Sequence, residues 1–289
     1  MRIKYLLHIL LICLLSSAVA DAQSYYTSTE YGLAIGMSQY FGDLNENYGF
    51  QTTSPSYGCY VRKHMNPYIS VKAVFNYTSV GYDDKYNTDP YQQERNLSFK
   101  STVIEVAAQA EFNFFRFVTG DEQHRFTPYL TGGIGGFYYN PYTFYKGVKY
   151  YLQPLGTEGQ NAGYNARQYS NYAVCFPIGA GVKYWLKAGI NLSFEIADRL
   201  TTTDYLDDVS STYVGTGAFT GKNVNPIALA LQDRSKEVIT AGEPLGRLGK
   251  QRGNSSNKDQ YLVAILSVSW HFTTYRCPQY LRNDMIRVR

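Results

Sequence analysis

The chain has 289 residues and a formal net charge of +4, which is too small in a chain of this length to indicate a nucleic-acid partner. Aromatic residues make up 16% of the chain, with 29 Tyr, and 25 residues are Gly. Beyond the N-terminus no run approaches the roughly eighteen apolar residues of a transmembrane helix. This composition favours an all-β protein in an aromatic-belted membrane wall, with a soluble secreted β-sandwich as the alternative.

The N-terminus predicts a cleaved secretory signal peptide over residues 1–22. Arg2 and Lys4 precede an apolar core over residues 5–15, and small residues up to Ala22 complete the cleavage pattern. An anchoring helix is the rival interpretation, but the apolar core is short and contains His8. We expect residues 23–29 to be a periplasmic N-terminal segment of an exported protein.

Eight segments are strand candidates, and seven of them alternate apolar side chains with polar or small ones at the two-residue period of a β-strand, whereas residues 126–139 are rich in glycine and their facing is ambiguous. The eight are residues 30–41, 56–63, 68–78, 97–114, 126–139, 172–186, 189–199 and 261–272. The last reads YLVAILSVSWHF, which is longer than the nine to eleven residues or so that span a bilayer as a tilted strand. Its apolar face ends in Trp270 and Phe272, residues typical of a membrane interface.

The connections between these segments alternate strictly in length. Residues 43–55, 79–96, 140–171 and 200–258 are long gaps, whereas residues 64–67, 115–125 and 187–188 are short ones. Outer-membrane barrels combine tight periplasmic turns with long extracellular loops. The sequence therefore predicts an eight-stranded antiparallel up-and-down transmembrane β-barrel over residues 30–273, located in the bacterial outer membrane in contact with its lipid.

The inferred interior face of the strands carries charges that cannot face hydrocarbon and are expected to pair across the lumen. These residues are Arg62, Lys72, Glu105, Glu111, Lys183, Glu195 and His271. The small residues opposite the apolar face of the first strand suit a narrow interior. Because eight strands leave just enough room for side chains, we expect a filled wall and not a pore.

Three aspartates, Asp204, Asp207 and Asp208, lie in the predicted fourth extracellular loop. Calcium binding is one interpretation, but the spacing lacks the glycine and the closing glutamate of an EF-hand loop. Capping of turns or of a short helix is the preferred role, and no metal site is expected.

Ser269 and His271 share a strand face and are similar to the His-x-Ser pair of barrels that deacylate lipid A. Here the order is reversed, the face is the lumen, and no pairing acid is evident. His64 and His124 are expected to be solvated in turns. We therefore expect no catalytic residues, no cofactor and no enzymatic activity.

The last residues, 274–289, are predicted to form a periplasmic tail. Three cysteines follow the signal peptide, Cys59, Cys175 and Cys277, and an odd number in an oxidising compartment leaves at least one unpaired within the chain. The tail is either a frayed terminus or a contact arm for a periplasmic partner. In the second interpretation its contact residues are Arg276, Cys277, Pro278 and Arg282.

Several stretches resemble the PorG-like outer-membrane proteins of the Bacteroidetes type IX secretion system. They are EYGLAIGMSQYFGDLN (30–45), STVIEVAAQAEFNFF (101–115), RLTTTDYLDDVSSTYV (199–214), LALQDRSKE (229–237), RGNSSNKDQY (252–261) and Cys277-Pro278. The resemblance implies an eight-stranded barrel that anchors a periplasmic ring, built from a lipoprotein and its partner subunit, and so supports protein export. It implies no catalysis.

An alternative function is a surface-exposed binding barrel or adhesin, whose tyrosine-rich loops meet an external ligand. The tyrosines concerned are Tyr138, Tyr139, Tyr142, Tyr145, Tyr150 and Tyr151.

Overall fold

A computed structural model describes residues 28–220, 225–240 and 242–273. The strands are β1 (Ser28–Phe41), β2 (Ser54–His64), β3 (Ile69–Asp83), β4 (Ser98–Asn113), β5 (Phe126–Tyr145), β6 (Val148–Tyr151), β7 (Tyr172–Lys187), β8 (Ile190–Thr201) and β9 (Gln260–Thr273). The helices are α2 (Pro90–Arg95), α3 (Leu152–Leu155) and α4 (Pro226–Gln232), with 3₁₀ turns η2 (Asp84–Tyr86), η3 (Glu122–His124), η4 (Asn165–Arg167), η5 (Thr216–Thr220) and η6 (Ser235–Glu237). No helix among these residues is both long and apolar enough to cross a membrane.

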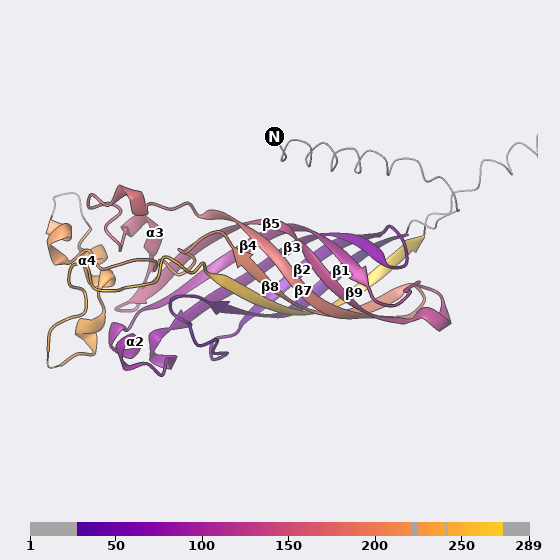
Figure 1. Cartoon of the computed structure of the whole chain (residues 1–289), viewed down its shortest axis with the longest axis horizontal. Coiled ribbons are helices and arrows are strands. Elements are labelled where there is room, and N and C mark those ends of the chain that lie inside the picture. Colours follow the sequence, from indigo (N-terminus) through magenta and orange to yellow (C-terminus); the bar gives the residue numbers. More distant parts are fainter. Residues whose placement is uncertain (1–27, 221–224, 241, 274–289) are drawn as a thin grey trace, which may run out of the picture. The chain divides into compact units, whose positions relative to one another are not determined.

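Eight of the strands form a closed antiparallel barrel (Figure 1). The sheet order is β4-β3-β2-β1-β9-β8-β7-β5, and a further pairing of β4 with β5 closes it. β6 stands outside the barrel and pairs only with the end of β5, across Lys146 and Gly147 with φ of 50° and 79°. The predicted eight-stranded up-and-down barrel is confirmed.

The connections sort by length between the two ends of the barrel. At one end, residues 65–68, 114–125 and 188–189 join consecutive barrel strands, and the last of these is a two-residue turn at Ala188 (φ 47°) and Gly189 (φ 75°). At the other end lie residues 42–53, 84–97, 146–171 and 202–259. Two strands extend well beyond their predicted ends. β5 runs on to Tyr145, because its last residues form the hairpin with β6, and β3 runs on to Asp83, which pairs with Ser98 of β4.

The outward positions of the barrel strands expose large apolar side chains that a water-facing sheet would bury. Examples on successive strands are Leu33, Ile35, Val61, Phe75, Val106, Leu130, Ile134, Ile178, Ile196 and Leu266. Exposed aromatic residues lie toward both ends, such as Tyr57, Tyr77 and Tyr172 near the long connections. At the short-turn end the rings of Tyr31 and Phe272 pack edge to face at 5.6 Å. An apolar wall bordered by aromatic residues has the pattern of a barrel surrounded by lipid.

The four long connections fold into a cap at their end of the barrel, which contains α2, α3 and α4 (Figure 1). A cluster of buried apolar residues runs from the adjoining barrel interior into this cap. It includes Tyr40, Val80, Phe99, Val103, Phe137, Leu152, Leu206, Val209, Leu231 and Tyr261. The cap is therefore a packed structure with its own core, not a set of separate loops.

Candidate functional site: the barrel interior and the cap

Glu111 lies at the centre of an ion-pair network that fills the barrel interior. Its carboxylate lies 2.9 Å from Arg62 Nε, 3.3 Å from Lys72 Nζ and 2.5 Å from Lys183 Nζ. Lys72 also pairs with Glu195 at 2.7 Å, and the Tyr129 hydroxyl donates to that glutamate. All the charged groups of this network are buried.

A second interior pair lies closer to the cap. Arg199 Nε is 3.2 Å from Glu105 Oε2, and the Tyr261 hydroxyl donates to the same oxygen at 2.9 Å. Glu30 and Arg62, which are 2.7 Å apart, form a further pair. Among the described strands, four glutamates therefore pair with four lysines and arginines inside the barrel: Glu30, Glu105, Glu111 and Glu195 with Arg62, Lys72, Lys183 and Arg199. The interior is thus neutral in charge and occupied by side chains, as an eight-stranded barrel permits.

Six of the seven interior residues named from the sequence are buried in these two groups of ion pairs: Arg62, Lys72, Glu105, Glu111, Lys183 and Glu195. His271 joins them through Glu30, with Nδ1 3.9 Å from Glu30 Oε1. Glu30 and Arg199 were missed as members of this network. Both occupy inward positions of their strands, so extending the two-residue alternation to the ends of β1 and β8 would have predicted them as interior residues.

The prediction for His64 is wrong. His64 is the buried last residue of β2 and not a solvated turn residue. Its Nε2 lies 2.6 Å from Glu30 Oε1, and its Nδ1 lies 2.8 Å from Ser70 Oγ. His124 does lie in a turn, half-exposed, where Nδ1 contacts Asp121 Oδ2 at 2.7 Å. The strand extends further than expected because these polar contacts satisfy the His64 ring inside the barrel.

An acid is also present beside Ser269 and His271, contrary to expectation, and it is Glu30. Ser269 donates its hydroxyl to Glu30 Oε2 at 3.1 Å. In a serine–histidine pair that activates a nucleophile, the serine hydroxyl donates its hydrogen bond to the histidine, whereas here it donates to a carboxylate. The arrangement supports packing of the interior and gives no support to acyl transfer.

Asp204, Asp207 and Asp208 are all buried in the cap, where they accept hydrogen bonds. Asp204 Oδ2 accepts from Ser210 Oγ at 2.5 Å, and Asp207 Oδ1 accepts from the Val209 backbone at 2.9 Å. Asp208 accepts from the Tyr169 hydroxyl at 2.6 Å and from the Thr157 hydroxyl. These contacts hold turns and link the loop after β8 to the loop after β6.

Tyr40 at the end of β1 bridges two buried carboxylates. Its hydroxyl oxygen lies 2.6 Å from Asp207 Oδ2 and 2.8 Å from Asp259 Oδ1. A phenol has one proton to donate, so both contacts are hydrogen bonds when one carboxyl keeps its own proton. Burial and repulsion from neighbouring carboxylates, among them Asp43, raise the pKa of both Asp207 and Asp259 well above the usual range. Burial likewise raises the pKa of the neighbouring Asp43 to about 7.

Two buried arginines tie the four long connections together. Arg95 forms two hydrogen bonds with Asp84, at 2.7 and 2.8 Å, and donates to the backbone oxygens of Asp43 and Arg252. Arg252 pairs with Glu158 at 2.9 Å and donates to the Asp208 carbonyl. Forked arginine contacts of this kind fix geometry as well as energy, so the cap is preorganised.

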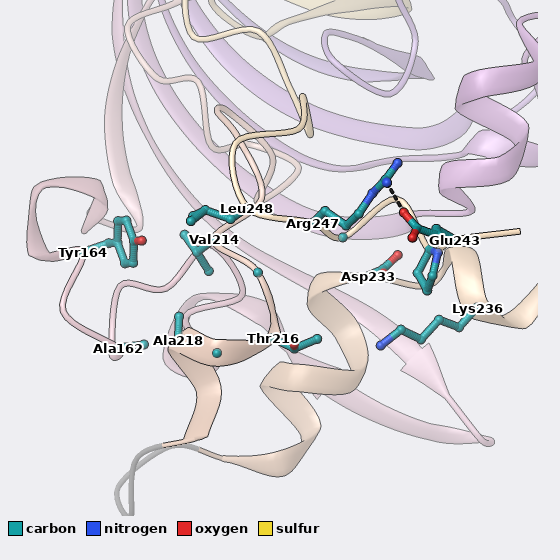
Figure 2. A pocket seen from close by; sticks show the side chains of 14 residues that line it. Ala162, Tyr164, Val214, Thr216, Ala218, Asp233, Lys236, Glu243, Arg247 and Leu248 are labelled. Atoms are coloured by element: carbon teal, nitrogen blue, oxygen red, sulfur yellow. Dashed lines mark hydrogen bonds and ion pairs between the residues drawn. The ribbon is translucent and has the colours of Figure 1, made fainter.

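A pocket of about 810 Å³ opens between the loops of the cap. Figure 2 shows Tyr164, Val214 and Leu248 on one side, Asp233 and Lys236 on the other, and Thr216 and Ala218 between them. Asp233 is buried, and its Oδ1 accepts from Ser235. Among the described residues no donor reaches its Oδ2. The pocket therefore offers a carboxylate oxygen, an ammonium group and apolar surface to a ligand.

The six tyrosines of the binding alternative do not form one open face. Tyr139 is buried and shares a hydrogen bond of 3.0 Å with Thr203, while Tyr151 is exposed and the other four are half-buried. Lys149 stacks over the rings of Tyr142 and Tyr151, at 3.7 and 4.7 Å from their centroids. Most of these rings pack along β5 and β6. β5 continues beyond residue 139, where the predicted strand ended, and β6 was not predicted.

The signal peptide, and the predicted contact residues Arg276, Cys277, Pro278 and Arg282, lie outside the described residues.

Comparison with protein families gives a match over residues 4–214 to the family described as Domain of unknown function (DUF6089). The match covers well over half of the chain. The chain belongs to the DUF6089 family. No curated protein sequence matches it significantly.

Several solved structures align with this DUF6089 chain. Ail of Yersinia pestis, in complex with the heparin analogue sucrose octasulfate, is 10% identical with a TM-score of 0.41, covering 86% of this chain and 100% of Ail. Neisserial surface protein A is 11% identical with a TM-score of 0.40, covering 84% and 97%. The N-terminal barrel domain of OprF from Pseudomonas aeruginosa is 11% identical with a TM-score of 0.34, covering 85% and 97%.

The DUF6089 match ends at Val214, inside the connection between β8 and β9. It therefore includes the buried motif TDYLDDVS (203–210) and does not reach the pocket residues after Val214 or the last strand. Within the matched region, the motif carries the three aspartates that hold the cap together.

Proposed function

We propose that the chain is an integral outer-membrane barrel with its long connections outside the cell and its short turns in the periplasm. The exposed apolar positions around the barrel and the aromatic residues near the short turns support this location. The signal peptide predicted over residues 1–22 is consistent with export.

We further propose that the protein is a non-enzymatic structural component that anchors the periplasmic ring of the type IX secretion system to the outer membrane. The observation that carries this proposal is the neutral ion-pair network centred on Glu111, which fills the lumen and leaves a wall rather than a channel. The secretion role and the ring partners, a lipoprotein and its partner subunit, rest on the resemblance to the PorG-like proteins.

The tail after β9 supplies the contact in this proposal, through Cys277 and its neighbours Arg276, Pro278 and Arg282. The test is removal of residues 274–289 from the chromosomal copy, with Cys277→Ser as the narrower change and Cys59→Ser, on the exposed outer wall, as the control. We expect the truncated protein to reach the outer membrane, to lose co-purification of the ring lipoprotein and to reduce secretion of cargo. Full secretion by a correctly inserted truncated barrel would contradict the tail as the anchor.

A non-reducing gel of the same membranes separates a covalent from a non-covalent contact. A high-mass band that contains a ring subunit, disappears with reductant and is absent from Cys277→Ser indicates a disulfide. A monomer band in the wild type, together with retained co-purification, indicates a non-covalent anchor.

The cap pocket favours a second function, surface binding of a hydroxyl-bearing ligand such as a glycan. The observation is the buried Asp233 carboxylate, whose Oδ2 lacks a donor among the described residues, together with Lys236 and the Tyr164 ring across the pocket. Asp233→Asn is expected to weaken glycan binding by whole cells at least tenfold, whereas Glu122→Gln at the opposite end of the barrel is expected to leave it unchanged. Equal binding by both variants would exclude this pocket.

A further inference from the structure

Two histidines and a glutamate converge inside the barrel at its short-turn end. Glu30 lies on β1, His64 on β2 and His271 on β9, which are three neighbouring strands of the sheet. One ligand atom from each side chain lies within 4.8 Å of the other two. Glu30 Oε1 is 2.6 Å from His64 Nε2 and 3.9 Å from His271 Nδ1.

The strand register explains why the three groups meet. Ser28 of β1 lies opposite His64 of β2, so Glu30 is one inward position further along its strand. His271 follows Ser269 on the inward face at the end of β9, and both lie next to Glu30. Near the mouth of the barrel, β1 is thus flanked by a histidine on each side.

Two imidazoles and one carboxylate form a donor set that suits zinc. Zinc bonds to such atoms of about 2.0–2.2 Å place tetrahedral ligand atoms roughly 3.3 Å apart. The two separations from Glu30 Oε1, 2.6 and 3.9 Å, fall on either side of this value, and the two histidine nitrogens lie within 4.8 Å of each other. The metal replaces the proton between His64 Nε2 and Glu30 Oε1.

Surrounding groups already orient these ligands, as outer partners do in zinc sites. The Ser70 hydroxyl lies 2.8 Å from His64 Nδ1 and accepts its proton when Nε2 binds metal. Glu30 Oε2 is held by Arg62 at 2.7 Å and by Ser269 at 3.1 Å, and Asn191 donates to Oε1 at 2.6 Å. These bonds fix the Glu30 carboxylate with Oε1 toward both histidines.

Access and charge define what kind of site this is. Glu30 is fully buried, and the side chains of His64 and His271 are only 7% and 10% exposed, so the ion would sit inside the end of the barrel. Glu30 already balances the Arg62 charge, so the site carries a net positive charge when occupied. This favours an exchangeable zinc over a permanently bound structural ion.

We propose that Glu30, His64 and His271 form a zinc site at the periplasmic mouth of the barrel. A bound ion connects the first, second and last strands and so stabilises the seam between β1 and β9, where the chain closes on itself. The site is independent of the secretion role proposed above.

The test uses the full mature chain, refolded in detergent with a histidine-free affinity tag, stripped with chelator and then dialysed against 20 µM zinc. Bound metal per chain is measured by mass spectrometry, and the folded fraction is followed by the unheated gel shift of the barrel on heating. We expect roughly one zinc per folded wild-type chain and a higher unfolding temperature in the presence of zinc.

His64→Gln and His271→Gln are expected to lower zinc affinity at least tenfold and to abolish the zinc-dependent temperature shift, while each still forms a folded barrel without metal. His124→Gln, at the turn between β4 and β5, is the matched control and should keep both the zinc affinity and the zinc-dependent temperature shift. Zinc that binds both glutamine variants as tightly as the wild type would overturn the site, and its loss in Cys277→Ser would assign the metal to that thiol. A folded wild-type barrel that binds no zinc at 20 µM would overturn it as well.

Discussion

At the scale of single residues, buried charges are tolerated in this protein because each interior ion pair is matched by others around it. Glu111 receives three cations, Arg62, Lys72 and Lys183, at 2.5 to 3.3 Å. Removing one partner of a buried pair costs much more than the pair itself contributes, since the charges left behind stay buried without compensation. The cap differs, because beside the Arg95–Asp84 and Arg252–Glu158 pairs it buries Asp207 and Asp259 without a paired cation among the described residues, and a raised pKa keeps a proton there instead.

Glu111→Gln should therefore destabilise the barrel by about 3–5 kcal/mol, because three cations lose their shared carboxylate. The measurement is urea unfolding of the refolded barrel in detergent. Glu122→Gln, which breaks an ion pair with Arg125 at the exposed turn, is the control and should change the unfolding free energy by less than about 1 kcal/mol. Equal effects of the two changes would show that the network does not support the fold.

Asp207 and Asp259 make the cap sensitive to pH. Their raised pKa values mean that the folded cap binds protons that the unfolded chain has lost, so the free energy of unfolding falls as pH rises from about 4 through 7 and above. We expect the cap to be less stable at pH 9 than at pH 6, measured by amide hydrogen exchange of the loops. Asp207→Asn removes one repelling charge and should flatten this dependence.

The control for this prediction is Asp121→Asn, in the turn at the opposite end of the barrel, which should leave the pH dependence of the cap unchanged. A cap whose exchange rates, corrected for intrinsic chemistry, are the same at both pH values would contradict a shared proton at Tyr40.

At the scale of elements, each strand alternates inward and outward side chains, and at a few glycines the absence of a side chain lets a neighbouring ring lie against the backbone. On β1 the position of a Gly32 side chain is already filled by the Tyr60 ring, which would lie 2.2 Å from an added Cβ. That ring in turn supports the Arg62 guanidinium, 4.8 Å from its centroid. A glycine thus makes room for an interior aromatic residue that orders the charge network.

Gly32→Ala should destabilise the barrel by about 1–3 kcal/mol, because the Tyr60 ring must move out of its place beneath Arg62. The matched control is Gly132→Ala on β5, where no atom lies within 4 Å of an added Cβ. The difference between their urea midpoints measures the effect. If Gly32→Ala unfolded at the same urea concentration as Gly132→Ala, the Tyr60 packing would be unimportant.

Much of the barrel was predictable because its strands follow a local rule. Period-two alternation located seven of the eight strands and six of the interior charges, but the facing of the glycine-rich fifth strand was ambiguous. The loop lengths gave the antiparallel up-and-down order. His64 was misread because its partners, Glu30 and Ser70, come from two other strands. The cap was not predictable, since Tyr40 meets Asp259, and Arg252 meets Glu158, across long stretches of sequence with no repeating pattern.

At the scale of the whole barrel, the two ends differ in construction. One end has tight turns and the Glu30–His64–His271 cluster, and the other has a packed cap with a pocket of about 810 Å³. Between them the interior is occupied by paired charges. A barrel whose interior is filled in this way suits a fixed anchor in a membrane better than a route for solutes. The absence of a conducting lumen is therefore central to the proposed function.

The most direct test of that claim is single-channel recording of the purified barrel in planar lipid bilayers. We predict no stepwise conductance for the inserted wild type, and its appearance when Arg62, Lys72, Glu111 and Lys183 are together replaced by alanine in a variant that still inserts. Stable, voltage-independent conductance steps of the wild type would contradict a filled lumen, and with it the interpretation of this barrel as a structural anchor.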